Sequence, residues 1–390
     1  MSAEKDRPVV LIVGMLDSPH LARWLKTLQP LQADFVLFPS AANRTIHPTI
    51  TDLIEHSDTA TFRTTGPEAR LGLVLWAVDL VLRGRVRQSL LKFRLRAIAV
   101  DIVHALELQH AGYLIANVLR DRQVDRQKIV LTNYGSDLFW FTRFTPHRER
   151  LEELLAIADV YSAECTRDIG LARQYGFAGT TLQVLPTAGG LDIASSRGEQ
   201  AQVPAAARKL VLIKGYTNFV GRAQDILREI SDRANAFEGW EIVVYSSTFH
   251  ARMLCWWMRR KQRGLNIRAI KKKALSHTQM MELFSKSAAY LGFSRSDGIS
   301  TSFLEALSTG AYPLQTSTAC VDEWREKGAI FHSLDIERPG DAVENLLAVL
   351  NDVDLRQRAM RINFEVAQQH LNVDEIADAF RDDYRSVLGL

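Results

Sequence analysis

The residues best suited to chemistry lie in one run at positions 294–315, SRSDGISTSFLEALSTGAYPLQ. An apolar strand is expected to end at Phe293, and a helix is expected to begin at residues 300–301 and to end at Gly310. A helix that follows a strand in this way presents unpaired backbone N–H groups and the positive end of its dipole, which together favour phosphate. Gly298 would let a ligand approach the backbone closely.

Two acidic residues in this run, Asp297 and Glu305, lie eight positions apart. This spacing puts one carboxylate in the loop and the other in the second helical turn. Carboxylates are poor ligands for phosphate, but they accept hydrogen bonds from sugar hydroxyls. Alternatively, Asp297 is a turn residue and Glu305 offsets the helix dipole. The segment as a whole favours a site for a phosphorylated sugar.

A second segment, LIKGYTNFVGRA at positions 212–223, combines glycines with two cations, Lys214 and Arg222. Cations beside backbone amides suit a diphosphate, whose charge must be met at several oxygens. We expect Lys214, Gly215 and Arg222 to contact such a group. The alternative is that both cations are solvated surface residues of a loop.

The elements that must position these residues alternate between short apolar runs and helical segments. Strands are expected at residues 9–13, 34–38, 98–103, 128–132, 209–213, 241–245, 288–292 and 310–314, and helices at residues 19–28 and 148–158. This alternation is typical of α/β domains with doubly wound parallel sheets.

A change of composition at residues 186–207, towards Gly, Ala, Ser, Pro and Gln, predicts a linker between two domains. We expect an N-terminal domain at residues 1–190 and a C-terminal domain at residues 191–372. A last helix, at about residues 373–390, is expected to pack back on the first domain. A ligand would then sit in a cleft that faces the carboxyl ends of both sheets.

The acidic pair resembles the E-x7-E signature of glycosyltransferase family 4, with Asp297 at the first position and Glu305 at the second. The run LEAL at positions 304–307, Gly310 and Pro313 also match the family's pattern. The resemblance implies the GT-B fold of two Rossmann-like domains. It also implies that the second acid binds the donor ribose and that the first lies by the transferred sugar.

The resemblance extends to the first half of the chain, where the residues match the family less closely. The segment at positions 101–112 is similar to the family's D-x-x-H-x-H motif, which implies that His110 or His104 approaches the donor sugar; we prefer His110. For either histidine, a structural role is the alternative. The turn at positions 132–137 resembles an H-G-S-D motif, with a plain polar turn as the alternative. Gly14 and His20 flank the first strand–helix turn, where the family's acceptor or phosphate loop lies. Together these imply acceptor-side residues Gly14, His20, Asn133, Gly135 and Asp137.

The reaction implied is transfer of a hexose-type sugar from a nucleotide sugar to a glycan or lipid-linked acceptor, with retention and without a metal or other cofactor. The departing diphosphate would be stabilised by Lys214, Arg222 and the amides of Gly298, Ile299 and Ser300. Two alternatives remain, a nucleotide-sugar epimerase of the same fold and a non-catalytic partner that has kept the fold. Motifs of other enzyme classes, such as G-x-x-x-x-G-K-[ST] and H-E-x-x-H, do not occur. Asp352-Val-Asp354 has a D-x-D form but reads as a helix N-cap.

Composition restricts the partners. The formal net charge of +3 gives no case for nucleic acid, and three widely spaced cysteines fit a reducing compartment. No signal peptide or membrane-spanning run is seen, so a cytoplasmic protein is expected.

Two basic stretches suggest a peripheral place at the inner face of the cell membrane. Residues 83–96 carry six cations and no acid, interleaved with Leu90, Leu91, Phe93 and Leu95, and we expect them to contact an anionic membrane surface. Residues 242–281 carry nine Lys or Arg and no acid around Trp256 and Trp257. For that second stretch, membrane contact and packing within the domain remain equal alternatives.

Overall fold

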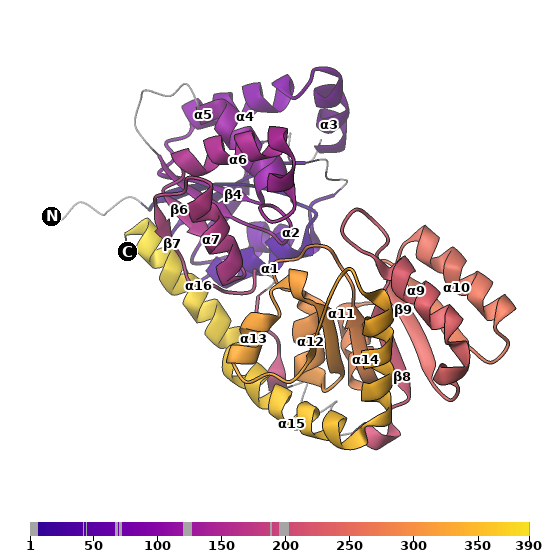
Figure 1. Ribbon diagram of the computed structural model, residues 1–390. Helices are drawn as coiled ribbons and strands as arrows, with labels where there is room; N and C mark the ends of the chain where they lie inside the picture. Colours follow the sequence, from indigo (N-terminus) through magenta and orange to yellow (C-terminus); the bar gives the residue numbers. More distant parts are fainter. Residues whose placement is uncertain are drawn as a thin grey trace. The chain divides into compact units, whose positions relative to one another are not determined.

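The computed structural model describes residues 7–41, 43, 45–66, 69, 72–119, 127–187, 189–194 and 203–389. The chain divides into two compact units, one made of Met1–Gly189 with Asp374–Leu390 and the other of Gly190–Val373. Each unit is an α/β sandwich built around one parallel sheet (Figure 1).

The sheet of the first unit has seven parallel strands in the order β3-β2-β1-β4-β5-β6-β7. The strands are β1 (Val9–Gly14), β2 (Asp34–Pro39), β3 (Thr61–Thr64), β4 (Ile102–Leu106), β5 (Lys128–Thr132), β6 (Val160–Ser162) and β7 (Thr180–Thr181). The helices of this unit are α1 (Pro19–Leu28), α2 (Pro48–His56), α3 (Gly72–Val81), α4 (Arg85–Ala97), α5 (Tyr113–Leu119), α6 (Thr145–Ile157), α7 (Thr166–Gln174) and α16 (Val373–Leu388), with short turns η2 (Leu108–Gly112) and η3 (Phe141–Arg143).

Helices cover both faces of this sheet because successive strand residues point to opposite sides. On β1, Leu11 and Val13 pack with α4, α5, α6 and α7, whereas Val10 and Ile12 pack with α1, α2 and α16. The last helix, α16, drawn in yellow in Figure 1, thus completes the core of the first unit although its sequence follows the second.

The sheet of the second unit has six parallel strands in the order β10-β9-β8-β11-β12-β13. The strands are β8 (Leu210–Lys214), β9 (Glu241–Ser247), β10 (Asn266–Lys271), β11 (Ser287–Gly292), β12 (Tyr312–Thr316) and β13 (His332–Leu334). The helices are α9 (Ala223–Asp232), α10 (Phe249–Lys261), α11 (His277–Ser285), α12 (Thr301–Thr309), α13 (Asp322–Glu326), α14 (Pro339–Asn351) and α15 (Val353–His370), with short turns η4 (Ala205–Ala207), η5 (Ala234–Phe237) and η6 (Ser317–Ala319).

Helices again cover both faces of this second sheet. α9, α10 and α14 pack on one face, and α11, α12 and α15 pack on the other. All described strand pairs in both sheets are parallel, which confirms the predicted α/β class.

Most predicted elements are confirmed, including the strands at residues 9–13 and 128–132. The strand predicted at residues 98–103 is present, but its bounds are wrong: α4 ends at Ala97 and the strand runs from Ile102 to Leu106. Asp352 is confirmed as a helix N-cap, since its side chain accepts a hydrogen bond from the Leu355 amide.

Only part of the basic stretch at residues 83–96 is exposed and so able to contact a membrane surface, as predicted. Leu91 and Leu95 of α4 are buried in the core of the first unit, and Arg87 is buried as well. Their predicted contact with a membrane is therefore wrong, because Leu91 and Leu95 pack in the core and Arg87 is bound to Asp79 and to the carbonyls of Ser40 and Gly72. Phe93 is exposed.

His104 lies inside the first unit, in the middle of β4. Its ring nitrogens contact the hydroxyls of Tyr384 of α16 at 2.7 Å and of Thr132 of β5 at 2.8 Å, and Trp24 packs edge-on against the ring. Complete burial lowers the pKa of His104 to about 3, because the cation would lose its hydration. These contacts give His104 a structural role in joining α16 to the sheet.

This burial predicts a pH-dependent stability of the first unit. An unfolded histidine takes up a proton below about pH 6.5, whereas the folded His104 does so only near pH 3. The contribution of neutral His104 to the free energy of unfolding is therefore complete above about pH 6.5. Below that pH it falls by about 1.4 kcal/mol per pH unit. Between pH 7 and pH 5, the free energy of unfolding measured in urea should fall by about 2 kcal/mol more for the wild type than for His104→Gln.

The matched control is His56→Gln, since the side chain of His56 is 70% exposed. This variant should keep the pH dependence of the wild type. An equal loss in His104→Gln and the wild type would contradict the structural role.

Candidate functional site

Two loops at the carboxyl edge of the second sheet are joined to each other by backbone contacts. One follows β8 and the other follows β11. Gly221 and Ser294 form an antiparallel bridge between the loops, and the Arg222 amide donates to the Phe293 carbonyl at 3.0 Å. This pairing brings the end of β8 next to the segment that leads into α12.

The pairing places Lys214, the last residue of β8, beside the start of α12. Its ammonium lies 3.6 Å from a carboxylate oxygen of Asp297 and donates to the Ser300 hydroxyl at 3.4 Å. Burial, the largest single effect, would lower the pKa of Lys214, but Asp297 together with Tyr290, Tyr216 and Glu305 holds that pKa above its usual value. Lys214 is therefore a charged and largely buried cation, which is suited to binding an anion.

Two glycines allow the first loop to follow this path. A Cβ on Gly215 would lie 2.8 Å from the Ser247 Cα, and one on Gly221 would lie 2.3 Å from the Tyr216 Cβ. Both positions therefore require the absence of a side chain. The predicted glycine-containing loop after β8 is confirmed. Gly215 allows this loop to pack closely against β9.

α12 begins and ends where the sequence predicted. Its N-cap is Ser300, and Gly310 closes it in the left-handed region with a φ of 81°. The Gly298 amide donates to the Asp297 carboxylate at 3.1 Å, so it is already engaged. Within the described part of the chain, no acceptor pairs with the amides of Ile299 and Ser300. These amides, at the positive end of α12, complement the charge of Lys214.

Glu305 lies in the second turn of α12 and is 7% exposed. One of its carboxylate oxygens is 3.7 Å from Nδ1 of His277, the first residue of α11. Sequence reasoning missed His277, because α11 is joined to α12 only through the fold. The pair presents a carboxylate acceptor beside an imidazole at the same edge of the sheet.

Arg222, predicted to contact the diphosphate together with Lys214, is engaged by other groups in the structure. The Arg222 guanidinium contacts the Asp225 carboxylate in the first turn of α9 and donates to the Ile336 carbonyl at 3.0 Å. It is also 3.6 Å from Glu337. Through these contacts Arg222 links α9 to the loop that follows β13.

A different cation accompanies Lys214. The ammonium groups of Lys214 and Lys272 lie 5.3 Å and 5.4 Å from the centre of the same Tyr216 ring. Lys272 follows β10 directly and is exposed. Lys272 belongs to the basic stretch at residues 242–281, but nothing in the sequence distinguishes this lysine from its solvated neighbours.

In the first unit, an acidic residue missed by sequence reasoning organises the loop after β4. Glu107 has a φ of 86°, which is rare for a residue with a side chain and is found at functional sites. Its buried carboxylate accepts from the amides of His110 and Ala111 at the start of η2. The same carboxylate contacts Nδ1 of the His110 ring at 3.1 Å, and this hydrogen bond raises the pKa of His110. The His110 side chain is 61% exposed.

Asp137 joins the loops that follow β4 and β5. Its carboxylate accepts from the Leu108 amide at 2.8 Å and from the Tyr134 amide at 3.1 Å. Burial, together with the charge of Glu107, raises the pKa of Asp137. Gly135 occupies the left-handed region with a φ of 47°. Both residues therefore shape the turn.

The remaining predicted residues of the first unit lie at the same edge of its sheet. The Asn133 amide group donates to buried Asp168 at 2.7 Å, and the carbonyl of Gly14, the last residue of β1, accepts from Ser40 at 2.9 Å. His20 is exposed at the start of α1. The structure thus collects Gly14, Asn133 and His110 at the carboxyl ends of β1, β5 and β4.

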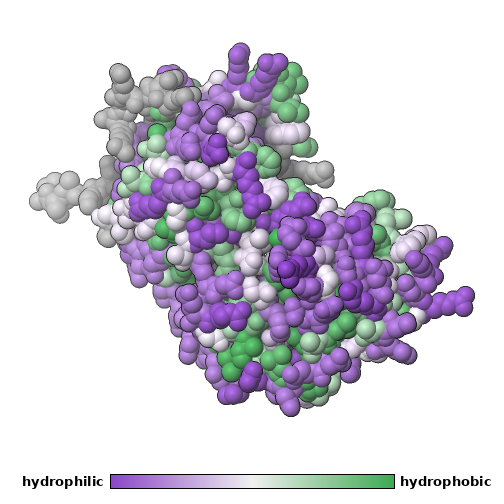
Figure 2. Space-filling view, viewed as in Figure 1, coloured by the Kyte–Doolittle hydropathy of each residue, from purple (hydrophilic) through white to green (hydrophobic). Residues whose placement is uncertain are grey.

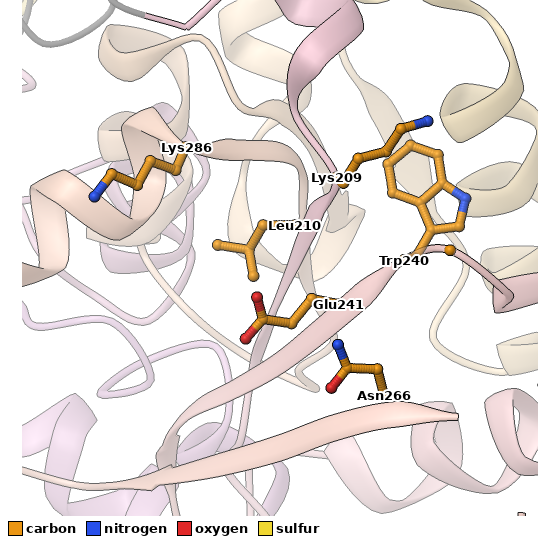
Figure 3. Close-up of a pocket in the computed structure, with 7 residues that line it drawn as sticks. Lys209, Leu210, Trp240, Glu241, Asn266 and Lys286 are labelled. Carbon is orange, nitrogen blue, oxygen red and sulfur yellow. The ribbon is translucent and has the colours of Figure 1, made fainter. Parts of the chain in front are cut away.

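A shallow pocket of about 390 Å³ lies at the other edge of the second sheet (Figure 3). It is lined by residues at or near the amino ends of the strands: Lys209, Leu210, Gly239, Trp240, Glu241, Asn266 and Lys286. In parallel α/β sheets, ligands bind at the carboxyl edge. This pocket is therefore separate from the site around Lys214.

Comparison with known proteins gives matches in structure and none in sequence. No protein-family model matches the chain, and neither does a curated protein sequence. Similar solved structures include sucrose-phosphate synthase from Thermosynechococcus elongatus, with a TM-score of 0.70, 13% identity, and 98% of this chain and 100% of that chain covered.

Trehalose 6-phosphate synthase from Burkholderia multivorans has a TM-score of 0.68 at 14% identity, covering 98% of this chain and 99% of that chain. HepE of Anabaena, solved in complex with UDP and glucose, has a TM-score of 0.66 at 13% identity, covering 97% of this chain and 100% of that chain. These likenesses do not single out glycosyltransferase family 4. They confirm the GT-B fold that the sequence resemblance implied.

Proposed function

We propose that the chain is a retaining glycosyltransferase that uses a nucleotide-sugar donor. The observation that carries the proposal is the partly buried, charged Lys214 beside the N-terminus of α12, with Glu305 one turn further along the helix. A cation and unpaired amides suit a diphosphate, and a buried carboxylate suits ribose hydroxyls. The resemblance of the acidic pair to family 4 supports the same reaction.

We assign the donor to the second unit. Lys214, Lys272 and the amides of Ile299 and Ser300 bind the diphosphate, and Glu305 accepts hydrogen bonds from the ribose. Lys272 replaces Arg222 in this assignment, because Arg222 is engaged with α9 and the loop after β13. Asp297 keeps Lys214 charged and lies by the transferred sugar.

The reaction proceeds on one face of the sugar. The bond between the anomeric carbon and the donor phosphate oxygen breaks, and the acceptor oxygen bonds to that carbon from the same side. The acceptor proton passes to the departing phosphate oxygen. Lys214 and the α12 amides stabilise the negative charge that develops there. This route needs no carboxylate nucleophile and no metal.

The first unit supplies the acceptor side, for which we propose a glycan or a lipid-linked glycan. His110 is the histidine that contacts the donor sugar, because Glu107 holds Nδ1 of its ring and the side chain is accessible. His104 has no such access. An epimerase would instead release an isomerised sugar without an acceptor, and a non-catalytic partner would turn over no donor at all.

Replacing Glu305 with Gln should weaken donor binding about 5- to 10-fold, because a charge-assisted hydrogen bond of about 1.5–3 kcal/mol to the ribose becomes a neutral one of about 0.5–1.5 kcal/mol. Isothermal calorimetry with a panel of nucleotide sugars, and with the nucleoside diphosphate alone, measures this change. Lys214→Met should weaken binding of both the sugar nucleotide and the diphosphate.

A suitable control is Glu365→Gln, because Glu365 lies on α15 with a side chain 59% exposed. It should bind every ligand as the wild type does. Unchanged affinity in Glu305→Gln, with a normal thermal midpoint, would remove Glu305 from the site. No binding of any nucleotide sugar by the wild type would refute the proposed function.

Chelation should leave sugar transfer intact, because Lys214, Lys272 and backbone amides take the place of a metal at the diphosphate. Initial rates with excess EDTA should match those without it, and added Mg²⁺ should not raise them. A complete loss of activity in EDTA that Mg²⁺ restores would show that the diphosphate is held by a metal ion.

A further inference from the structure

Helix α3 presents an apolar surface to solvent, although apolar helices of water-soluble domains ordinarily bury that surface. Its sequence, GLVLWAVDLV, has one charged residue, Asp79. Leu80 is 63% exposed and Val81 is 80% exposed. The other exposed apolar residues of α3 and its C-terminal turn are Leu73, Val74, Trp76, Val78 and Leu82. Figure 2 shows green, apolar side chains gathered over the position of α3.

The helix is held to the first unit by its polar side. The Asp79 carboxylate accepts from the amides of Val86 and Arg87, at 2.8 Å and 3.1 Å, and so caps the start of α4. The Arg87 guanidinium lies 3.7 Å from Asp79 and donates to the carbonyls of Ser40 and Gly72 at 2.6 Å and 3.4 Å. The acid points inward and the apolar residues point outward, which is the reverse of an ordinary amphipathic helix.

The start of α3 is closely seated. A Cβ on Gly72 would lie 1.9 Å from the side-chain oxygen of Asn43, whose amide group donates to the Ala69 carbonyl at 2.9 Å. The outward orientation of the apolar side is therefore fixed by buried contacts at both ends of the helix.

Positive charge borders this apolar surface. Residues 80–100 contain six Lys or Arg and no Asp or Glu. Of these cations Arg83, Arg85, Lys92 and Arg96 are exposed, and Phe93 beside them is 57% exposed. A tryptophan and aliphatic side chains next to a cationic rim are the composition of helices that lie at a lipid–water interface.

We propose that α3 and the exposed side of α4 form a membrane-binding surface for anionic lipid bilayers. The apolar side chains of α3 enter the boundary between head groups and acyl chains, and the four exposed cations contact anionic head groups. α3 is about 15 Å long, too short to cross a hydrocarbon core of about 30 Å, so it lies in the interface. No helix within the described residues is long and apolar enough to span a membrane.

A lipid surface fits these residues better than a second copy of the chain. Face-to-face pairing of two such surfaces would bring the cations of both α4 helices together, whereas an anionic leaflet attracts them. The inference stands independently of sugar transfer, because vesicle binding requires neither donor nor acceptor.

The experiment measures co-sedimentation of the full chain with vesicles of phosphatidylcholine alone or mixed with phosphatidylglycerol. The wild type should bind the mixed vesicles and not the neutral ones, and binding should weaken as salt rises. The triple variant Leu73→Gln, Leu80→Gln, Val81→Gln should lower partitioning about 100-fold or more, because each buried aliphatic side chain contributes at least about tenfold. Replacing Arg83, Arg85, Lys92 and Arg96 with Gln should lower it about fivefold per cation.

Both variants should keep the thermal midpoint of the wild type, since they change only exposed side chains. The matched control is Trp256→Gln with Trp257→Gln on α10, because these two residues are also exposed and lie beside Arg260 and Lys261. This control should bind vesicles as the wild type does.

Three outcomes would overturn the proposal. In the first, the wild type remains in the supernatant with anionic vesicles at low salt. In the second, the α10 control loses binding and the α3 variant keeps it. In the third, light scattering shows a dimer that the α3 variant abolishes while vesicle binding is unchanged, which would make this surface a contact between copies of the chain.

Discussion

The candidate donor site depends on one interaction, the ion pair between partly buried Lys214 and Asp297. Burial disfavours the charged form of a lysine, so Asp297 and the polar groups around it keep Lys214 a cation that can attract an anion. The loop pairing at Gly221 and Ser294 brings the two residues together, and only glycine fits at position 221. A ligand diphosphate would join the same arrangement of charges, with the α12 amides completing its coordination.

The parts of this site that could be predicted from sequence are those encoded locally. The strand end, the loop at Asp297, the N-cap Ser300 and the closing Gly310 occur within some twenty residues, and each has its own backbone chemistry. The two parallel sheets were predictable for the same reason, because each apolar run and each helical segment carries its own periodicity. Glu305 follows from the start of α12, since helical spacing fixes its turn.

Partners that are distant in sequence could not be predicted in this way. The sequence favoured Arg222 for a diphosphate and gave Lys272 no role beyond its basic stretch. The contacts that reverse this choice form only in the folded chain, namely Asp225 for Arg222 and the Tyr216 ring for Lys272. The two histidines differ for a related reason. Placing the strand about four residues too early left His104 at its end, whereas the structure puts His104 inside β4, under Tyr384 of the last helix.

Helix α3 shows the limit of hydrophobic patterning most clearly. A short helix that is apolar on nearly every side is ordinarily interpreted as buried, and nothing in its own sequence says otherwise. The position of its single acid decides the matter, because Asp79 caps α4 and binds Arg87, and a helix held by that side must turn its leucines and valines outward. Exposed apolar area is unfavourable in water, and here a buried ion pair holds it in place. Its exposure is offset only where another apolar phase covers it. The acid-free cationic border is the reason that we propose an anionic bilayer as that phase.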